Sequence, residues 1–163
     1  MTTPASPDDP EATERQLDGF IERFDPEVAE RARACRAALR ARMPTANELV
    51  YDNYNALAIG YAPRERTSEA IVSLAVTPRG PALYFIHGAS LPDPDGVLTG
   101  EGRQGRYVRL AGPGTLEEPA VATLLRLALD RSEPPLATDG AGRTVIKSIS
   151  ARQRPRRKGA AGA

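Results

Sequence analysis

The sequence predicts an α+β domain in which an antiparallel β-sheet packs against N-terminal helices and a C-terminal helix. Apolar residues recur at helical spacing up to about residue 43, alternate at strand spacing between about residues 55 and 110, and return to helical spacing over about 118–131. The 163 residues suffice for one sizeable core. We therefore expect a single domain over residues 11–150, a disordered N-terminus over 1–10 and a basic disordered tail over 151–163.

Two helices are predicted at the start of the domain. The first covers about residues 11–24, and its apolar face has i, i+3, i+4, i+7 spacing: Leu17, Phe20, Ile21 and Phe24. Asp25 and Pro26 begin a second helix that ends near Met43, because Asp is a common N-cap and Pro suits the first helical position. The first helix has an acidic flank formed by Glu11, Glu14, Asp18 and Glu22. The second has a basic flank formed by Arg33, Arg36 and Arg40, so we expect the two flanks to pair.

The middle of the chain predicts a sheet. Apolar and polar residues alternate over four segments, residues 55–61, 70–76, 82–86 and 107–110. The loops between the first three are short and polar, as antiparallel connections require. A third helix over about 118–131 follows, and residues 144–149 fit a last strand.

Composition narrows the class of protein. Apolar residues make up 40% of the chain and charged residues 26%, which is typical of a globular domain. The single cysteine excludes an internal disulfide and fits a reducing compartment. No apolar run is long enough to span a membrane, and the first residues lack the pattern of a signal peptide. We therefore expect a cytoplasmic protein with no membrane association and no cofactor.

The glycine-rich segment 100–105 has the literal spacing G-x-G-x-x-G, at Gly100, Gly102 and Gly105. A dinucleotide site requires a strand before this motif and a helix after it, whereas here a turn-rich loop precedes it and a strand follows. The glycines therefore predict a hairpin connection. Arg103 and Arg106 beside them are candidates for holding an anion on this loop.

Two features are candidates for ligand binding or chemistry. A polar and aromatic cluster precedes the first predicted strand and contains Tyr51, Asn53, Tyr54 and Asn55. Such residues either line a ligand pocket or cap the core and hold a loop. His87 is the only histidine, which excludes a metal site built on several histidines, and it follows the strand over 82–86. Cys35 lies on the apolar face of the second helix, where burial makes a thiol unreactive.

The basic tail contains the sequence RQRPRRK, whose cations could neutralise phosphates. Outside this tail acidic residues outnumber basic ones, and aromatic residues make up only 5% of the chain. We therefore expect nucleic-acid binding to be absent and the tail to be solvated.

Part of the sequence resembles a known family. The segments EAIVSLAV, ALYFIHGASLPDPDGVLTGEGRQGRYVRL and EEPAVATLL are similar to the YdhG-like family, known as domain of unknown function 1801. The loop pattern of that family is matched by Gly88, Ala89, Leu91, Asp93, Pro94, Gly96, Leu98, Gly100 and Gly102. The resemblance covers about residues 17–131 and implies an α+β fold with an antiparallel sheet. Many members carry a Trp where LVYDNYN stands here.

The resemblance carries over no catalytic residue. It does imply a link to frataxin-type iron carriers, in which Glu11, Glu14, Asp18 and Glu22 would bind iron through hard oxygen ligands. Our leading hypothesis is a non-enzymatic domain that binds a small ligand or a protein partner near residues 51–55 and His87. The alternatives are the iron carrier and an enzyme of unknown reaction with His87 as general base.

Overall fold

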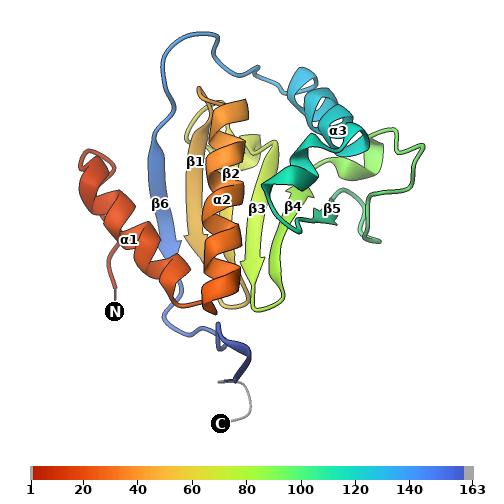
Figure 1. Ribbon diagram of the computed structural model, residues 1–163. Helices are drawn as coiled ribbons and strands as arrows, with labels where there is room; N and C mark the ends of the chain where they lie inside the picture. The colour runs from red at the N-terminus through yellow and green to blue at the C-terminus, as the bar shows by residue number, and fades with distance from the viewer. Residues whose placement is uncertain (1, 160–163) are drawn as a thin grey trace.

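The structure is a computed structural model that describes residues 2–159 (Figure 1). Its helices are α1 (Pro10–Glu22), α2 (Pro26–Arg42) and α3 (Pro119–Asp130), with short 3-10 turns η1 (Thr67–Glu69), η2 (Gly88–Ser90) and η3 (Pro113–Glu117). Its strands are β1 (Asn47–Asp52), β2 (Leu57–Ala62), β3 (Val72–Thr77), β4 (Gly80–Phe85), β5 (Arg106–Arg109) and β6 (Thr144–Ile149). The α+β class is confirmed. None of the described helices has the length and apolar character needed to cross a bilayer.

The six strands form one sheet in the order β5-β4-β3-β2-β1-β6. Strands β1 to β5 are antiparallel to their neighbours, as the short loops predict. The last strand, over residues 144–149, is also present, but β6 runs parallel to β1. The chain leaves α3, passes over the end of the sheet and enters β6 in the same direction as β1 (Figure 1).

Strand β1 was not predicted, because its pattern is unusual. Glu48 and Asp52 point into the protein and are 2% exposed, so acids occupy positions where the alternation of a strand would show apolar residues. Because these buried positions are acidic, the hydrophobic alternation of the sequence does not reveal the strand. Tyr51 therefore belongs to β1, and residues 53–56 form the turn into β2.

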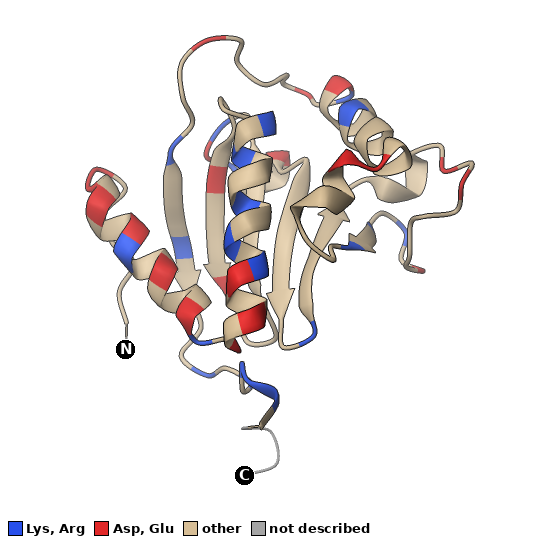
Figure 2. Ribbon diagram, in the orientation of Figure 1, with Lys and Arg blue, Asp and Glu red and all other residues tan. Residues whose placement is uncertain are grey.

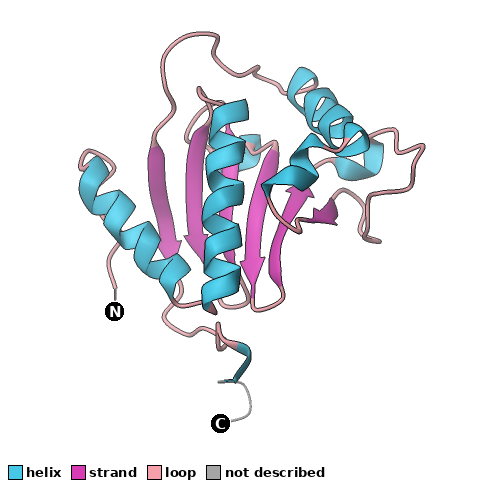
Figure 3. Cartoon of the chain, in the orientation of Figure 1, coloured by secondary structure: helices cyan, strands magenta, loops and turns pink. Residues whose placement is uncertain are grey.

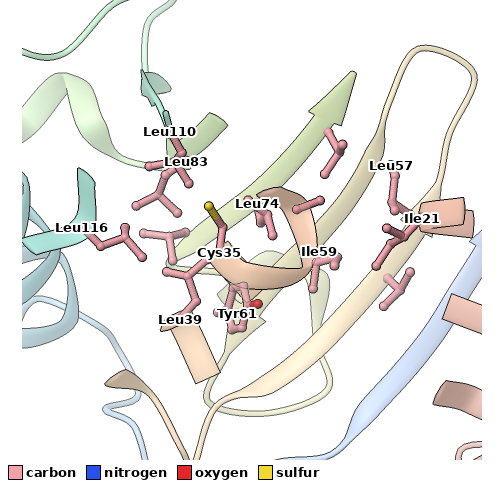
Figure 4. Close-up of a cluster of buried hydrophobic side chains, with 14 of the residues drawn as sticks. Ile21, Cys35, Leu39, Leu57, Ile59, Tyr61, Leu74, Leu83, Leu110 and Leu116 are labelled. Atoms are coloured by element: carbon pink, nitrogen blue, oxygen red, sulfur yellow. The ribbon is translucent and has the colours of Figure 1, made fainter. Parts of the chain in front are cut away.

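All three helices cover the same face of the sheet (Figure 3). Helix α2 lies against β3 and β4, and α1 lies against β6 and α2. The core fills the space between α2 and the sheet, where Cys35 and Leu39 meet Ile59, Tyr61 and Leu74 (Figure 4). On the opposite face, the segment after β2 covers β1 and β6: Asn47 Nδ2 donates to the Pro63 carbonyl over 3.1 Å, and Lys147 donates to the Glu65 carbonyl over 3.2 Å.

The described parts of both termini differ from the expected disorder. Before α1, the backbone N–H of Ala5 donates to Gln16 Oε1 over 2.7 Å, and Gln16 Nε2 donates to the Thr3 carbonyl over 2.8 Å. After β6, Arg156 is 4% exposed, so the expectation of a solvated tail is wrong at this residue. Its guanidinium forms an ion pair with the buried carboxylate of Asp52. Residues 1 and 160–163 of the two segments lie outside the described residues.

Candidate functional site

His87 lines a cavity of about 290 Å³ at the end of the sheet where β4 finishes. Three segments build its walls: residues 68–71 before β3, residues 87–91 after β4, and residues 128–133 at the C-terminal end of α3. Each wall adjoins regular structure, because the first runs from η1 to the residue before β3, the second contains η2 and the third contains the end of α3 and the three residues after it. We call this cavity the His87 pocket.

The floor of the His87 pocket is apolar. Phe85, the last residue of β4, is fully buried, and Ile71, the residue before β3, is 7% exposed. Leu91 and Ala128 add apolar surface from η2 and α3. Successive side chains of a strand point to opposite faces, so Leu83 and Phe85 of β4 both point into the core. The pocket opens beside Phe85, the last residue of this strand.

The rim of the pocket is polar and carries one cation that is held in place. Arg131 follows the last turn of α3, and its Nη1 donates to the Ser90 carbonyl over 2.9 Å. The hydroxyl of Ser90 donates to the His87 carbonyl over 2.9 Å, so η2 and the end of α3 are tied together beside the imidazole. Among residues 2–159, Arg131 takes part in no ion pair and the His87 ring in no hydrogen bond. Both side chains therefore have donors to offer a ligand.

The rim also carries two acids. Glu69 binds Arg64, whose Nε lies 2.9 Å from Oε1. This hydrogen bond lowers the pKa of Glu69 below its usual value and leaves its charge balanced by a partner outside the cavity. Glu133 is exposed on the rim, in the same segment as Arg131. Within residues 2–159 neither Glu133 nor Arg131 takes part in an ion pair, so Arg131 is the rim cation that can meet an anion.

The residues predicted to share a ligand surface with His87 lie at the other end of the sheet. The register pairs Phe85 with Val72 and Val72 with Tyr61, whereas the turn over residues 53–56 follows Asp52 at the opposite strand ends. The prediction of one surface containing both groups is therefore wrong. The sequence does not reveal the order and direction of the strands, and these put His87 and residues 51–55 at opposite ends of the sheet.

The residues of the cluster over 51–55 lie in β1 and in the turn that follows it, where they contact η1 and the segment after β6. The hydroxyl of Tyr51 bonds to the Thr67 hydroxyl on the face opposite the helices. Tyr54 is 50% exposed in the turn, beside Asn55, which is also exposed. The Asn53 backbone closes the turn onto Ala56 and its carbonyl accepts from Arg156. The cluster therefore builds a turn and holds the chain after β6, which is the structural alternative considered for it.

The acidic flank of α1 pairs with the basic flank of α2, as predicted (Figure 2). Glu14 accepts from Arg36 over 2.5 Å and from Arg40 over 3.5 Å. Asp18 and Glu22 both accept from Arg33, over 2.9 and 2.7 Å. Glu11 is exposed at the start of the helix. No group of three or more potential metal ligands is found among residues 2–159, so these carboxylates are arranged for arginine.

The two arginines beside the glycine loop are also separate from the pocket. Arg106 Nη1 donates to the carbonyls of Gly102 and Gly105 over 2.6 and 2.7 Å, so it holds its own loop in shape. Gly88 packs against this residue so closely that a Cβ atom at position 88 would lie 2.6 Å from the Cβ of Arg106. Arg103 is exposed.

The structure contains two buried ionic clusters that the sequence does not predict. In the first, Glu48 accepts from Arg36, from the Thr144 hydroxyl over 2.8 Å and from the Tyr61 hydroxyl over 2.9 Å. Burial and the nearby Glu48 charge raise the pKa of Tyr61. In the second, Asp52 accepts from Arg156 over 3.1 Å and from Gln153 over 2.7 Å. The carboxylates of both clusters are fully bonded, which marks them as parts of the scaffold.

Comparison with protein-family models, with curated proteins and with solved structures gives no match for this chain.

Proposed function

We propose that the protein is a non-enzymatic binding domain whose His87 pocket takes a small molecule with an apolar body and an anionic group. The observation that carries the proposal is the arrangement of Arg131, which stands over an apolar floor with no ion-pair partner among the described residues. Ligand pockets combine such a floor with a few polar groups that fix orientation.

The shape and the charge of the pocket specify the ligand. Its volume of about 290 Å³ lies at the lower end of the usual range for small-molecule sites, so the ligand is small. An apolar ring or short chain fits over Phe85 and Ile71. A carboxylate or a phosphate monoester fits Arg131, because guanidinium groups bind these anions through two parallel hydrogen bonds. His87 supplies a further donor.

Binding without catalysis is favoured by the surroundings of His87. A general base needs a group that orients its ring and a partner within hydrogen-bond reach. Within residues 2–159 the imidazole has no such hydrogen bond, and the serine nearest to it along η2 uses its hydroxyl on the His87 carbonyl. Assignment to the YdhG-like family and a cytoplasmic location belong to the same proposal. The α+β sheet with two leading helices and a later helix agrees with what that resemblance implies.

Calorimetric titration with benzoate, hexanoate and phenyl phosphate tests the proposal. We expect at least one of these probes to bind, and Arg131→Gln to weaken binding about tenfold or more, since a hydrogen bond to a charged group contributes about 1.5–3 kcal/mol. Arg126→Gln is the matched control, because Arg126 is an exposed arginine on α3 that does not line the pocket. Ala128→Leu should block the cavity, whereas Thr123→Leu on the exposed side of α3 should not.

Circular dichroism of each variant establishes that the fold is retained, because Arg131 also holds Ser90. Absence of binding by all three probes would overturn the proposal. So would binding that Arg131→Gln and Arg126→Gln weaken equally.

A further inference from the structure

The face of the sheet that no helix covers carries a pair of stacked tyrosines. Tyr84 lies between the core residues Leu83 and Phe85 in β4, so its side chain points to the opposite face, where it is 39% exposed. It pairs in register with Tyr107 of β5. The two rings stack, with their centroids 4.9 Å apart and their planes at 27°. Tyr84 and Tyr54 are the large apolar side chains that the described residues expose most.

Small residues leave space beside the Tyr84 ring. Its neighbour on β3 is Ser73, and the next residue across the sheet is Gly60 of β2. A Cβ atom at position 60 would lie 3.6 Å from the Cβ of Ala70, which marks where the segment after β2 begins to cover the sheet. Ser73 is partly exposed whereas Gly60 is buried, so the uncovered surface beside Tyr84 extends over about one strand spacing, or ~5 Å. The small side chain of Ser73 leaves the partly exposed ring of Tyr84 accessible to a flat aromatic base.

The strands β2 to β5 direct only basic charges to this face, and the acids Glu65 and Glu69 of the segment after β2 are each paired with an arginine. Among the residues of β2 to β5 that alternate toward it there is no acid. Arg109 is exposed on β5, and its guanidinium carbon lies 5.7 Å from the centroid of Tyr107. Arg79 is exposed at the turn between β3 and β4, toward the same end of the strands as Arg109. A second copy of the chain on this face would bring like charges together, which disfavours it as the occupant.

We propose that this tyrosine face binds single-stranded nucleic acid, with a base stacked on Tyr84 and phosphates placed at Arg109 and Arg79. Exposed aromatic rings on a sheet flanked by cations are how proteins hold single strands with little sequence preference. The composition of the whole chain predicts no nucleic-acid binding, because acids outnumber bases outside the tail and aromatics are few. Folding changes the local balance, since the sheet places two of the five tyrosines side by side on strands that direct no acid to this face.

Fluorescence anisotropy with a labelled oligo-dT or oligo-U strand tests the proposal on the full chain. We expect Tyr84→Ala and Tyr107→Ala each to weaken binding by about fivefold or more, the effect of losing one stacked base. Tyr54→Ala is the matched control, because Tyr54 is equally a surface tyrosine but lies in the β1–β2 turn. Arg109→Gln should reduce the slope of log affinity against log salt by about 0.7, the contribution of one phosphate contact.

The remaining outcomes would overturn the proposal. They are no binding by the wild-type chain, equal weakening by the three tyrosine variants, and binding that depends on the exposed Arg152 and Arg154 but not on Tyr84. A competition experiment adds a further test, in which unlabelled strand or polyglutamate of the same charge displaces the labelled strand. Displacement by both competitors at the same concentration would also overturn the proposal. In that case the surface recognises an acidic peptide and the bases contribute nothing.

Discussion

Arg36 on α2 binds the buried carboxylate of Glu48 on β1 through two nitrogens, with Nη2 2.8 Å from Oε1 and Nε 3.0 Å from Oε2. The same guanidinium reaches Glu14 on α1. Burial disfavours its charge, but the hydrogen bonds that Arg36 donates to Glu14 and Glu48 outweigh burial and raise the pKa of Arg36. One side chain thus joins both N-terminal helices to the sheet.

Glu48→Gln should lower the free energy of unfolding by about 3 kcal/mol, because it leaves the charge of the largely buried Arg36 with only the half-exposed Glu14 as partner. Glu14→Gln is the comparison, since Glu14 binds the same arginine but its side chain is 46% exposed. A half-exposed pair contributes about 1 kcal/mol or less. Urea unfolding at neutral pH measures both values, and equal losses would refute the central role assigned to Glu48.

Tyr61 should make the protein less stable at alkaline pH. Its pKa is raised above 10 by burial and then by the Glu48 charge, so stability is complete below pH 10 and is lost as pH rises through the folded-state pKa, because only the unfolded chain ionises readily. Tyr61→Phe should reduce this loss while lowering stability at neutral pH by about 1 kcal/mol. Urea unfolding over a pH series checks it, with Tyr54→Phe as control. The same alkaline slope in all three proteins would contradict the prediction.

Cys35 should resist alkylation in the folded protein. It is fully buried between α2 and the sheet, and burial raises the pKa of its thiol to about 11, so little thiolate is present at neutral pH. Mass spectrometry after treatment with iodoacetamide should show modification in concentrated urea and almost none in buffer. Comparable rates in the two conditions would show that the core opens readily around α2.

Arg156→Ala should lower the free energy of unfolding by about 3 kcal/mol. This arginine lies in the basic segment that the sequence predicts to be a solvated tail. The side chain is 3% exposed, binds Asp52 and places its guanidinium carbon 5.3 Å from the centroid of Phe24. Arg154→Ala, two residues away and exposed, should change stability by less than about 0.5 kcal/mol. Chemical unfolding of the two variants separates them. If their midpoints coincide, the segment after β6 does not support the sheet.

The sequence was sufficient for the parts of the fold whose apolar pattern is regular. The face of α1 containing Leu17 and Ile21 and the face of α2 containing Cys35 and Leu39 are buried as predicted. Strand β1 was missed because Glu48 and Asp52 occupy core positions as ion pairs, which no hydrophobicity pattern shows. Their partners Arg36 and Arg156 come from distant segments, so only the folded chain identifies them.

The candidate site was less predictable than the fold. The sequence indicates that His87 is the only histidine and follows a strand, but it indicates for Arg131 only a place at the end of a helix. The two lie beside one cavity because α3 packs with its last turn over the end of β4, an arrangement that depends on strand order and helix placement. Tyr84 and Tyr107 similarly become neighbours only through the β4–β5 register.

The most direct test of the ligand-binding proposal uses the fact that His87 is the only histidine. Its imidazole gives one Cε1–H signal in a proton NMR spectrum, so titration with benzoate, hexanoate and phenyl phosphate reports on the surroundings of His87. We expect at least one of these anions to shift that signal to saturation in wild type and in Arg126→Gln at similar concentrations, and to require a concentration about tenfold or more higher in Arg131→Gln. An imidazole signal that none of the three anions moves, or that moves equally in Arg131→Gln, would contradict the proposed site.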